Sequence, residues 1–146
     1  MIAVDSNLLV YAHRPDFPQF ESANRVLRAL ADDPMTWAIP WPCVHEFLGV
    51  TTNPRVFRHP SPMEVAVRAI EALDANGNLV LLAEAEDHFV RLKEQVLAGR
   101  AVGPVVHDAK VAAICLSHGV TELWTADRDF SRFPALRVRN PLASRL

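Results

Sequence analysis

Five carboxylate residues occupy positions where an apolar run ends or a helix is expected to begin: Asp5, Glu46, Asp108, Asp127 and Asp129. Carboxylates that gather in one place repel one another and raise one another's pKa unless a cation lies among them. An all-oxygen set of ligands, without cysteine or histidine, selects a hard ion such as Mg²⁺ or Mn²⁺. If the five side chains converge, they favour a metal-dependent enzyme that hydrolyses phosphodiester bonds.

The elements that must position these acids follow from the apolar pattern. Strands are expected at residues 2–4, 36–39, 79–82 and 122–125, with a short fifth strand around Val138. Helices are expected after Pro42 and at residues 7–12, 18–31, 62–75, 84–98 and 104–118. This alternation predicts an α/β fold, a three-layer α/β/α sandwich with a mostly parallel sheet of four to five strands.

Two helix starts have recognisable capping patterns. Ser6 is expected to cap the first helix, because a serine hydroxyl can accept a hydrogen bond from a free backbone N–H. Ser61 and Glu64 are spaced as in a capping box, which predicts that they open the helix that follows Pro62.

The expected elements bring the five acids to one edge of the sheet. Asp5 and Asp127 follow strands, whereas Glu46 and Asp108 lie in the first turns of helices. In a doubly wound sheet, helices begin at the edge where strands end. Each acid alone has an ordinary explanation as a helix cap or as a charge favoured by the helix dipole. Only the whole set favours a metal site.

Composition limits the class of protein. The chain has 146 residues, of which 50% are hydrophobic and 22% charged, so we expect one folded domain over residues 1–146. A formal net charge of −2 argues against a strongly basic nucleic-acid-binding module. However, the basic residues outnumber the remaining acids once the five edge carboxylates are set aside.

The sequence also indicates a location. No apolar run approaches the roughly 20 residues of a membrane span, and the N-terminus lacks the pattern of a secretory signal. Cys43 and Cys115 lie in apolar stretches and form no CxxC pair, which is typical of buried thiols. We therefore expect a reduced, cytoplasmic protein without membrane contact.

Four short motifs resemble those of a known family: Asp5-Ser6-Asn7, His45-Glu46-Phe47, His107-Asp108-Ala109 and Thr125-Ala126-Asp127-Arg128-Asp129-Phe130. In their order they are similar to the motifs of PIN-domain ribonucleases, and among these to VapC-type toxins of toxin–antitoxin pairs. The last motif is the most specific. The resemblance covers the whole chain, and every acid that the family pattern expects is present.

The resemblance implies a metal-dependent endoribonuclease with Asp5, Glu46, Asp108 and Asp127 as catalytic carboxylates. It implies that Asp5, Asp108 and Asp127 hold Mg²⁺ or Mn²⁺. Four neighbours could orient a carboxylate or add a ligand: Ser6, Asn7, Thr125 and Asp129. The resemblance also implies a homodimer, silenced by a cognate antitoxin whose C-terminal segment lies along an apolar groove of the toxin.

Other residues are candidates for contact with RNA or with a partner. Arginine can bind a phosphate through two hydrogen bonds, and four arginines fall in loops near the acidic edge: Arg14, Arg55, Arg58 and Arg128. The alternative for each is a solvated surface charge. Leu8, Leu9 and Val26 on the first two helices are candidates for the partner groove, with the core as their alternative.

Two other functions compete with a nuclease. A PIN-like module could bind RNA or a protein without cutting, although the retention of every acid argues against it. A phosphatase of the haloacid-dehalogenase type needs a second aspartate two residues after the first, and position 7 is asparagine. His107 precedes Asp108, and adjacent residues on a helix point about 100° apart, so we expect only one of the two to face the site.

Overall fold

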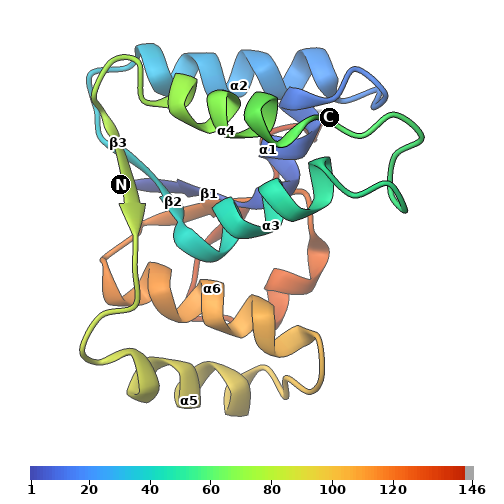
Figure 1. Cartoon of the computed structure of the whole chain (residues 1–146). Helices are drawn as coiled ribbons and strands as arrows, with labels where there is room; N and C mark the ends of the chain where they lie inside the picture. The colour runs from blue at the N-terminus through green and yellow to red at the C-terminus, as the bar shows by residue number, and fades with distance from the viewer. Residues whose placement is uncertain (144–146) are drawn as a thin grey trace.

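Five parallel strands form the central sheet of the computed structural model, which describes residues 1–143 (Figure 1). The sheet has the order β3-β2-β1-β4-β5, and every neighbouring pair is parallel. The strands are β1 (Ile2–Val4), β2 (Trp37–Pro40), β3 (Leu79–Leu82), β4 (Glu122–Trp124) and β5 (Val138–Arg139). Because all pairs are parallel, the carboxyl ends of the strands meet at one edge.

Within residues 1–143, six α-helices and one 3₁₀ helix surround the sheet. They are α1 (Ser6–His13), α2 (Phe20–Asp32), α3 (Trp41–Thr51), α4 (Met63–Leu73), α5 (His88–Ala98), α6 (Val105–Ser117) and the 3₁₀ helix η1 (Arg128–Arg132). Figure 1 places α1, α2 and α4 on one side of the sheet and α5 and α6 on the other. The predicted three-layer α/β/α sandwich is confirmed.

The core explains why the middle strands are almost wholly apolar. β1 and β2 lie between neighbouring strands and helices, and their residues Ala3, Val4, Ala38 and Ile39 are completely buried. Leu8 and Leu9 of α1 also lie in this core, with 0% and 2% of their surface exposed. Leu8 is therefore a core residue, whereas Leu9 packs in the core and also borders a cavity beside α2. No helix among residues 1–143 is both long and apolar enough to cross a membrane.

Two predicted caps are wrong. The N-cap of α1 is Asp5, whose Oδ1 accepts the Ser6 N–H at 2.7 Å, and Ser6 is the first helical residue. The N-cap of α4 is Pro62, and no side chain caps this helix. Ser61 has other partners, because its Oγ lies 2.9 Å from His13 Nε2 and accepts a hydrogen bond from Arg14. In both places a long-range hydrogen bond takes the hydroxyl that the local pattern assigned to a cap.

Most helix boundaries differ from the prediction by one or two residues, as at α2, which begins at Phe20 rather than Pro18, and two of the differences have a clear cause. α5 begins at His88 rather than Glu84, because the Asp87 carboxylate binds the Ser117 hydroxyl of α6 at 2.8 Å and so ties the preceding loop to the neighbouring helix. α4 ends at Leu73 rather than Ala75, where the Asp74 side chain turns to accept the Leu79 N–H of β3. A contact with the distant helix α6 therefore sets the start of α5, and a contact with the following strand β3 sets the end of α4.

The segment after β4 is held by aromatic packing. Phe130 of η1 and the adjoining Phe133 are buried, with ring centroids 6.1 Å apart. Phe133 lies against Gly99 at the end of α5, where a Cβ atom would stand 2.6 Å from Phe133 Cε1. This close approach fixes η1, and with it the acids at its start, against the α5 end of the molecule.

We expect Gly99→Ala to destabilise the fold by about 1–3 kcal/mol, because the added methyl overlaps a buried ring that has little room to move. Gly49→Ala is the matched control. Gly49 lies exposed within α3, and a Cβ atom there would meet no other part of the chain within 4 Å, so alanine should add about 0.5–1 kcal/mol of stability. Urea denaturation of the three proteins measures both effects. Equal stability of Gly99→Ala and the wild type would contradict the close packing of η1.

Candidate metal centre

Strand register places the first and last acidic motifs side by side. Val4 of β1 pairs with Trp124 of β4, so Asp5 and Thr125 both follow paired strand ends. The Asp5 N–H donates to the Trp124 carbonyl at 3.0 Å, which extends the pairing by one residue. Asp5 and Thr125, which are far apart in the sequence, therefore meet at the edge where strands end, as predicted.

Three aspartates form a group in which one carboxylate oxygen of each lies within 4.8 Å of the others. They are Asp108 at the start of α6, Asp127 after β4 and Asp129 in η1. Within the described residues the group contains neither Asp5 nor Glu46. Its oxygen-only donors suit a hard divalent cation such as Mg²⁺ or Mn²⁺. Asp129, predicted as a neighbour of the site, thus belongs to the group best placed to hold an ion.

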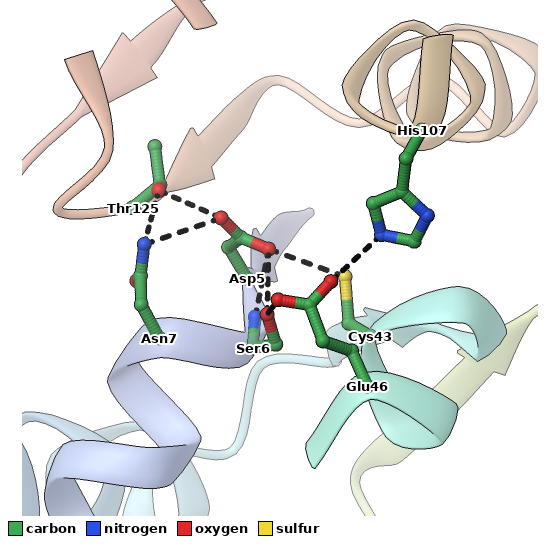
Figure 2. A network of polar contacts seen from close by, with 7 residues as sticks. All are labelled: Asp5, Ser6, Asn7, Cys43, Glu46, His107 and Thr125. Carbon is green, nitrogen blue, oxygen red and sulfur yellow. Dashed lines mark hydrogen bonds and ion pairs between the residues drawn. The ribbon is translucent and has the colours of Figure 1, made fainter. Parts of the chain in front are cut away.

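Asp5 is a buried carboxylate, 7% exposed, that accepts hydrogen bonds on both oxygens (Figure 2). Oδ1 accepts from the Ser6 N–H at 2.7 Å and from the Cys43 thiol at 3.4 Å. Oδ2 accepts from the Thr125 hydroxyl at 2.8 Å and from the Asn7 amide at 3.3 Å. Burial raises the pKa of Asp5, and the hydrogen bonds from Thr125, Ser6 and Cys43 act against that rise because they favour the charged form.

Thr125 and Asn7 link Asp5 to the last acidic motif. The Thr125 hydroxyl accepts from the Asn7 amide and from the Asp127 N–H, both at 3.0 Å. The Asn7 carbonyl oxygen accepts the Ala126 N–H at 3.2 Å. Asp127 in turn caps η1, because its Oδ1 accepts the Asp129 N–H at 2.8 Å. The predicted neighbours Ser6, Asn7 and Thr125 therefore all contact the backbone or side chain of a candidate acid.

Glu46 is bound through both of its carboxylate oxygens. The Ser6 hydroxyl donates to Oε1 and His107 Nε2 lies at Oε2, each at 2.8 Å (Figure 2). The hydrogen bond from His107 lowers the pKa of Glu46, and the same bond raises the pKa of His107. His107 and Asp108 point in different directions, as expected for adjacent residues on a helix: Asp108 joins the aspartate group, and His107 reaches Glu46.

Cys43 is a contact that the sequence reasoning missed. Its thiol donates to Asp5, and burial raises its pKa well above the ordinary value, so it remains a neutral donor. The available signal was its spacing: Cys43 lies three residues before Glu46 on α3, and residues three apart share one side of a helix. Both cysteines are buried and free, as expected.

Asp108 lies partly buried among other carboxylates, and this setting changes its ionisation. Burial and the nearby carboxylates of Asp127 and Asp5 raise the pKa of Asp108 from 3.8 to about 6. Near neutral pH the group therefore ionises against the field of its neighbours. A divalent cation bound among these carboxylates would favour the ionised form of Asp108 and so act against the rise in its pKa.

The four candidate arginines separate into two kinds. Arg14 donates to Asp16, to Ser61 and to the His59 carbonyl, and its guanidinium lies 4.2 Å from the centre of the Phe57 ring. It anchors the loop after α3, so we assign it to that structural role rather than to RNA contact. Arg55, Arg58 and Arg128 have exposed side chains.

Comparison with known proteins agrees with this geometry. A family model described as PIN domain matches residues 2–136. The chain belongs to the PIN-domain family. Ribonuclease VapC43 from Mycobacterium tuberculosis is 37% identical over 142 residues, covering 97% of this chain and 96% of that protein. The expected resemblance to VapC-type members of the PIN-domain family is confirmed.

Two solved structures share the PIN-domain fold. VapBC2 from Rickettsia felis, bound to a DNA fragment from its promoter, matches with a TM-score of 0.69 at 20% identity, covering 96% of this chain and 98% of that one. A toxin–antitoxin complex from Klebsiella pneumoniae matches with a TM-score of 0.64 at 19% identity, covering 97% and 98%. At these identities the matches establish the fold.

Asp108→Asn should stabilise the metal-free protein at pH 7.5 and have little effect at pH 4. The folded pKa, about 6, lies above the ordinary 3.8, so ionisation of Asp108 costs stability as the pH rises from about 4 through 6. Asparagine cannot ionise and removes that cost. Thermal unfolding in excess EDTA measures the difference from wild type at each pH.

Glu71→Gln on the exposed side of α4 is the control for this change of charge. It should alter the melting temperature equally at both pH values. An Asp108→Asn protein whose advantage over wild type is the same at pH 4 and pH 7.5 would contradict the electrostatic account of the cluster.

Proposed function

We propose that this protein is a divalent-metal-dependent endoribonuclease that hydrolyses RNA phosphodiester bonds. The observation that carries the proposal is the convergence of Asp108, Asp127 and Asp129 into one oxygen-ligand group beside the buried Asp5. Membership of the PIN-domain family and the likeness to a protein named ribonuclease support it. The phosphatase alternative has no support here, because Asn7 stands where its second aspartate is required.

Within this proposal, the catalytic carboxylates are Asp5, Glu46, Asp108 and Asp127. Asp108 and Asp127, together with Asp129, would hold Mg²⁺ or Mn²⁺. Asp5 would complete the metal site, because its carboxylate lies close enough to Asp108 for its charge to raise the pKa of Asp108. When bound, such an ion supplies electrostatic activation of water and of the phosphodiester. Ser6, Asn7 and Thr125 hold the carboxylates in place through the hydrogen bonds described above.

The three exposed arginines are placed where they could bind phosphates of the RNA. Arg55 and Arg58 lie in the loop after α3, and Arg128 separates two of the cluster aspartates. A guanidinium at these places can bind a phosphate on either side of the one being cleaved. This contact should weaken as the salt concentration rises, because phosphate binding releases counterions.

Asp108→Asn should reduce RNA cleavage by at least about 100-fold, since removal of a charge that stabilises the transition state commonly has an effect of this size. Purified wild type should cut structured RNA with Mg²⁺ or Mn²⁺ and stop cutting when EDTA is added. Glu71→Gln, distant from the cluster, is the control and should cut as wild type does. Cleavage that survives both EDTA and Asp108→Asn refutes the proposal. RNA binding without any cleavage supports the non-cleaving module instead.

The proposal extends to the partners that the family resemblance implies: a homodimer of cytoplasmic location, silenced by a cognate antitoxin. A cavity of about 510 Å³ between α2 and α4, lined in part by Leu9, Leu27, Ala69 and Ala72, supports an apolar groove for a partner segment.

Exposed apolar side chains on and beyond α5, such as Phe89 and Leu97, support self-association, which light scattering in solution measures.

Ala72→Arg should weaken capture of a cognate antitoxin, because the long charged side chain enters the groove from an exposed position on α4. Val65→Arg, also exposed on α4 but outside the lining of the cavity, is the matched control. Co-purification of the tagged pair, followed by the RNA-cleavage assay, reports both binding and silencing. Undiminished capture by Ala72→Arg would exclude this groove as the binding site.

A further inference from the structure

The Glu46 carboxylate is held at a fixed place by two donors from different elements. The Ser6 hydroxyl of α1 binds Oε1, and His107 Nε2 of α6 binds Oε2, each at 2.8 Å (Figure 2). A carboxylate only accepts hydrogen bonds, so Nε2 carries the proton in this contact. The neutral imidazole with Nε2 protonated and the imidazolium both satisfy it. With one donor on each oxygen, rotation of the carboxylate breaks at least one bond.

Glu46 is also set apart from the other acids. The ligand group of the described residues consists of Asp108, Asp127 and Asp129, and Glu46 is not in it. Ser6 joins Glu46 to Asp5, because the same residue donates its N–H to Asp5 at 2.7 Å. The start of α6 therefore contributes to both parts of the site. Asp108 enters the aspartate group, and His107, one residue earlier, holds Glu46.

We propose that His107 is a positioning residue that fixes Glu46 beside Asp5 and outside the aspartate group. The inference rests on the proposed nuclease function and adds a residue to its machinery. His107 acts through Glu46, which it orients toward the space next to Asp5. Without His107, Glu46 keeps only the Ser6 contact, and its half-exposed side chain can turn into solvent.

Steady-state kinetics on a single-stranded RNA test this role. His107→Ala should lower kcat about 10- to 100-fold, the usual effect of removing a group that orients a functional side chain, while KM for the RNA stays unchanged. His107→Gln should recover part of the loss, because its amide nitrogen can donate to Glu46 from a similar reach. In a Glu46→Gln background, His107→Ala should have no further effect, since the two residues act as one unit.

His45→Ala is the matched control. This histidine precedes Glu46 on α3 and packs beside Trp41, with ring centroids 6.0 Å apart, so its loss should leave kcat unchanged. The proposal is overturned if the effects of His107→Ala and Glu46→Gln multiply in the double variant. It is also overturned if His107→Ala raises KM alone, which would make His107 an RNA contact.

A binding measurement without RNA separates positioning from metal binding. Calorimetric titration with Mn²⁺ should give the wild-type affinity for His107→Ala, because Glu46 lies outside the aspartate group. Asp108→Asn should bind Mn²⁺ at least about 10-fold more weakly, because loss of a direct ligand costs no less than loss of a group that orients one. Equal weakening in both variants would place His107 in support of the metal group itself and refute the proposal. Failure of the nuclease function differs from either result, because then the wild type cuts no RNA.

Discussion

The buried carboxylate of Asp5 is the interaction on which the rest of the site depends. A charge removed from water is tolerated only when hydrogen bonds replace its hydration. The donors to Asp5 come from the start of α1, from α3 and from the end of β4. Only a parallel register between β1 and β4 brings these elements together. The need to satisfy Asp5 therefore joins the first motif of the chain to the last.

From Asp5 the site extends in two directions with different physical characters. On one side, Asp108, Asp127 and Asp129 form a group whose mutual repulsion favours a cation. On the other side, Glu46 is already stabilised by hydrogen bonds from within the protein. α6 serves both directions because successive residues on a helix diverge by about 100°. Because the acids are concentrated at one edge of the sheet, a chain with a net charge of −2 can offer a cation-binding site to a nucleic acid.

Much of this arrangement was predictable from the local pattern of apolar and polar residues. Apolar runs such as Ile2–Val4 and the helical spacing of α2 reflect burial on one side, and burial is encoded residue by residue. The position of Asp5, Asp108 and Asp127 at strand ends and helix starts then follows from the parallel topology. The caps were predicted poorly, because a hydroxyl such as that of Ser6 has several possible partners. This hydroxyl donates to Glu46, 40 residues away, instead of capping its own helix.

The sequence alone determined the α/β class, the identity of the acids and the edge at which they meet, because strand and helix patterns are local and parallel strands align their ends. Only the tertiary structure decided how the acids divide. Folding brings distant elements together, and the directions of their side chains then decide three contacts. Asp108 joins the aspartate group, His107 holds Glu46, and Cys43 donates to Asp5. Hydrogen bonds act over about 3 Å, and contacts at that range are set by packing in three dimensions rather than by spacing along the chain.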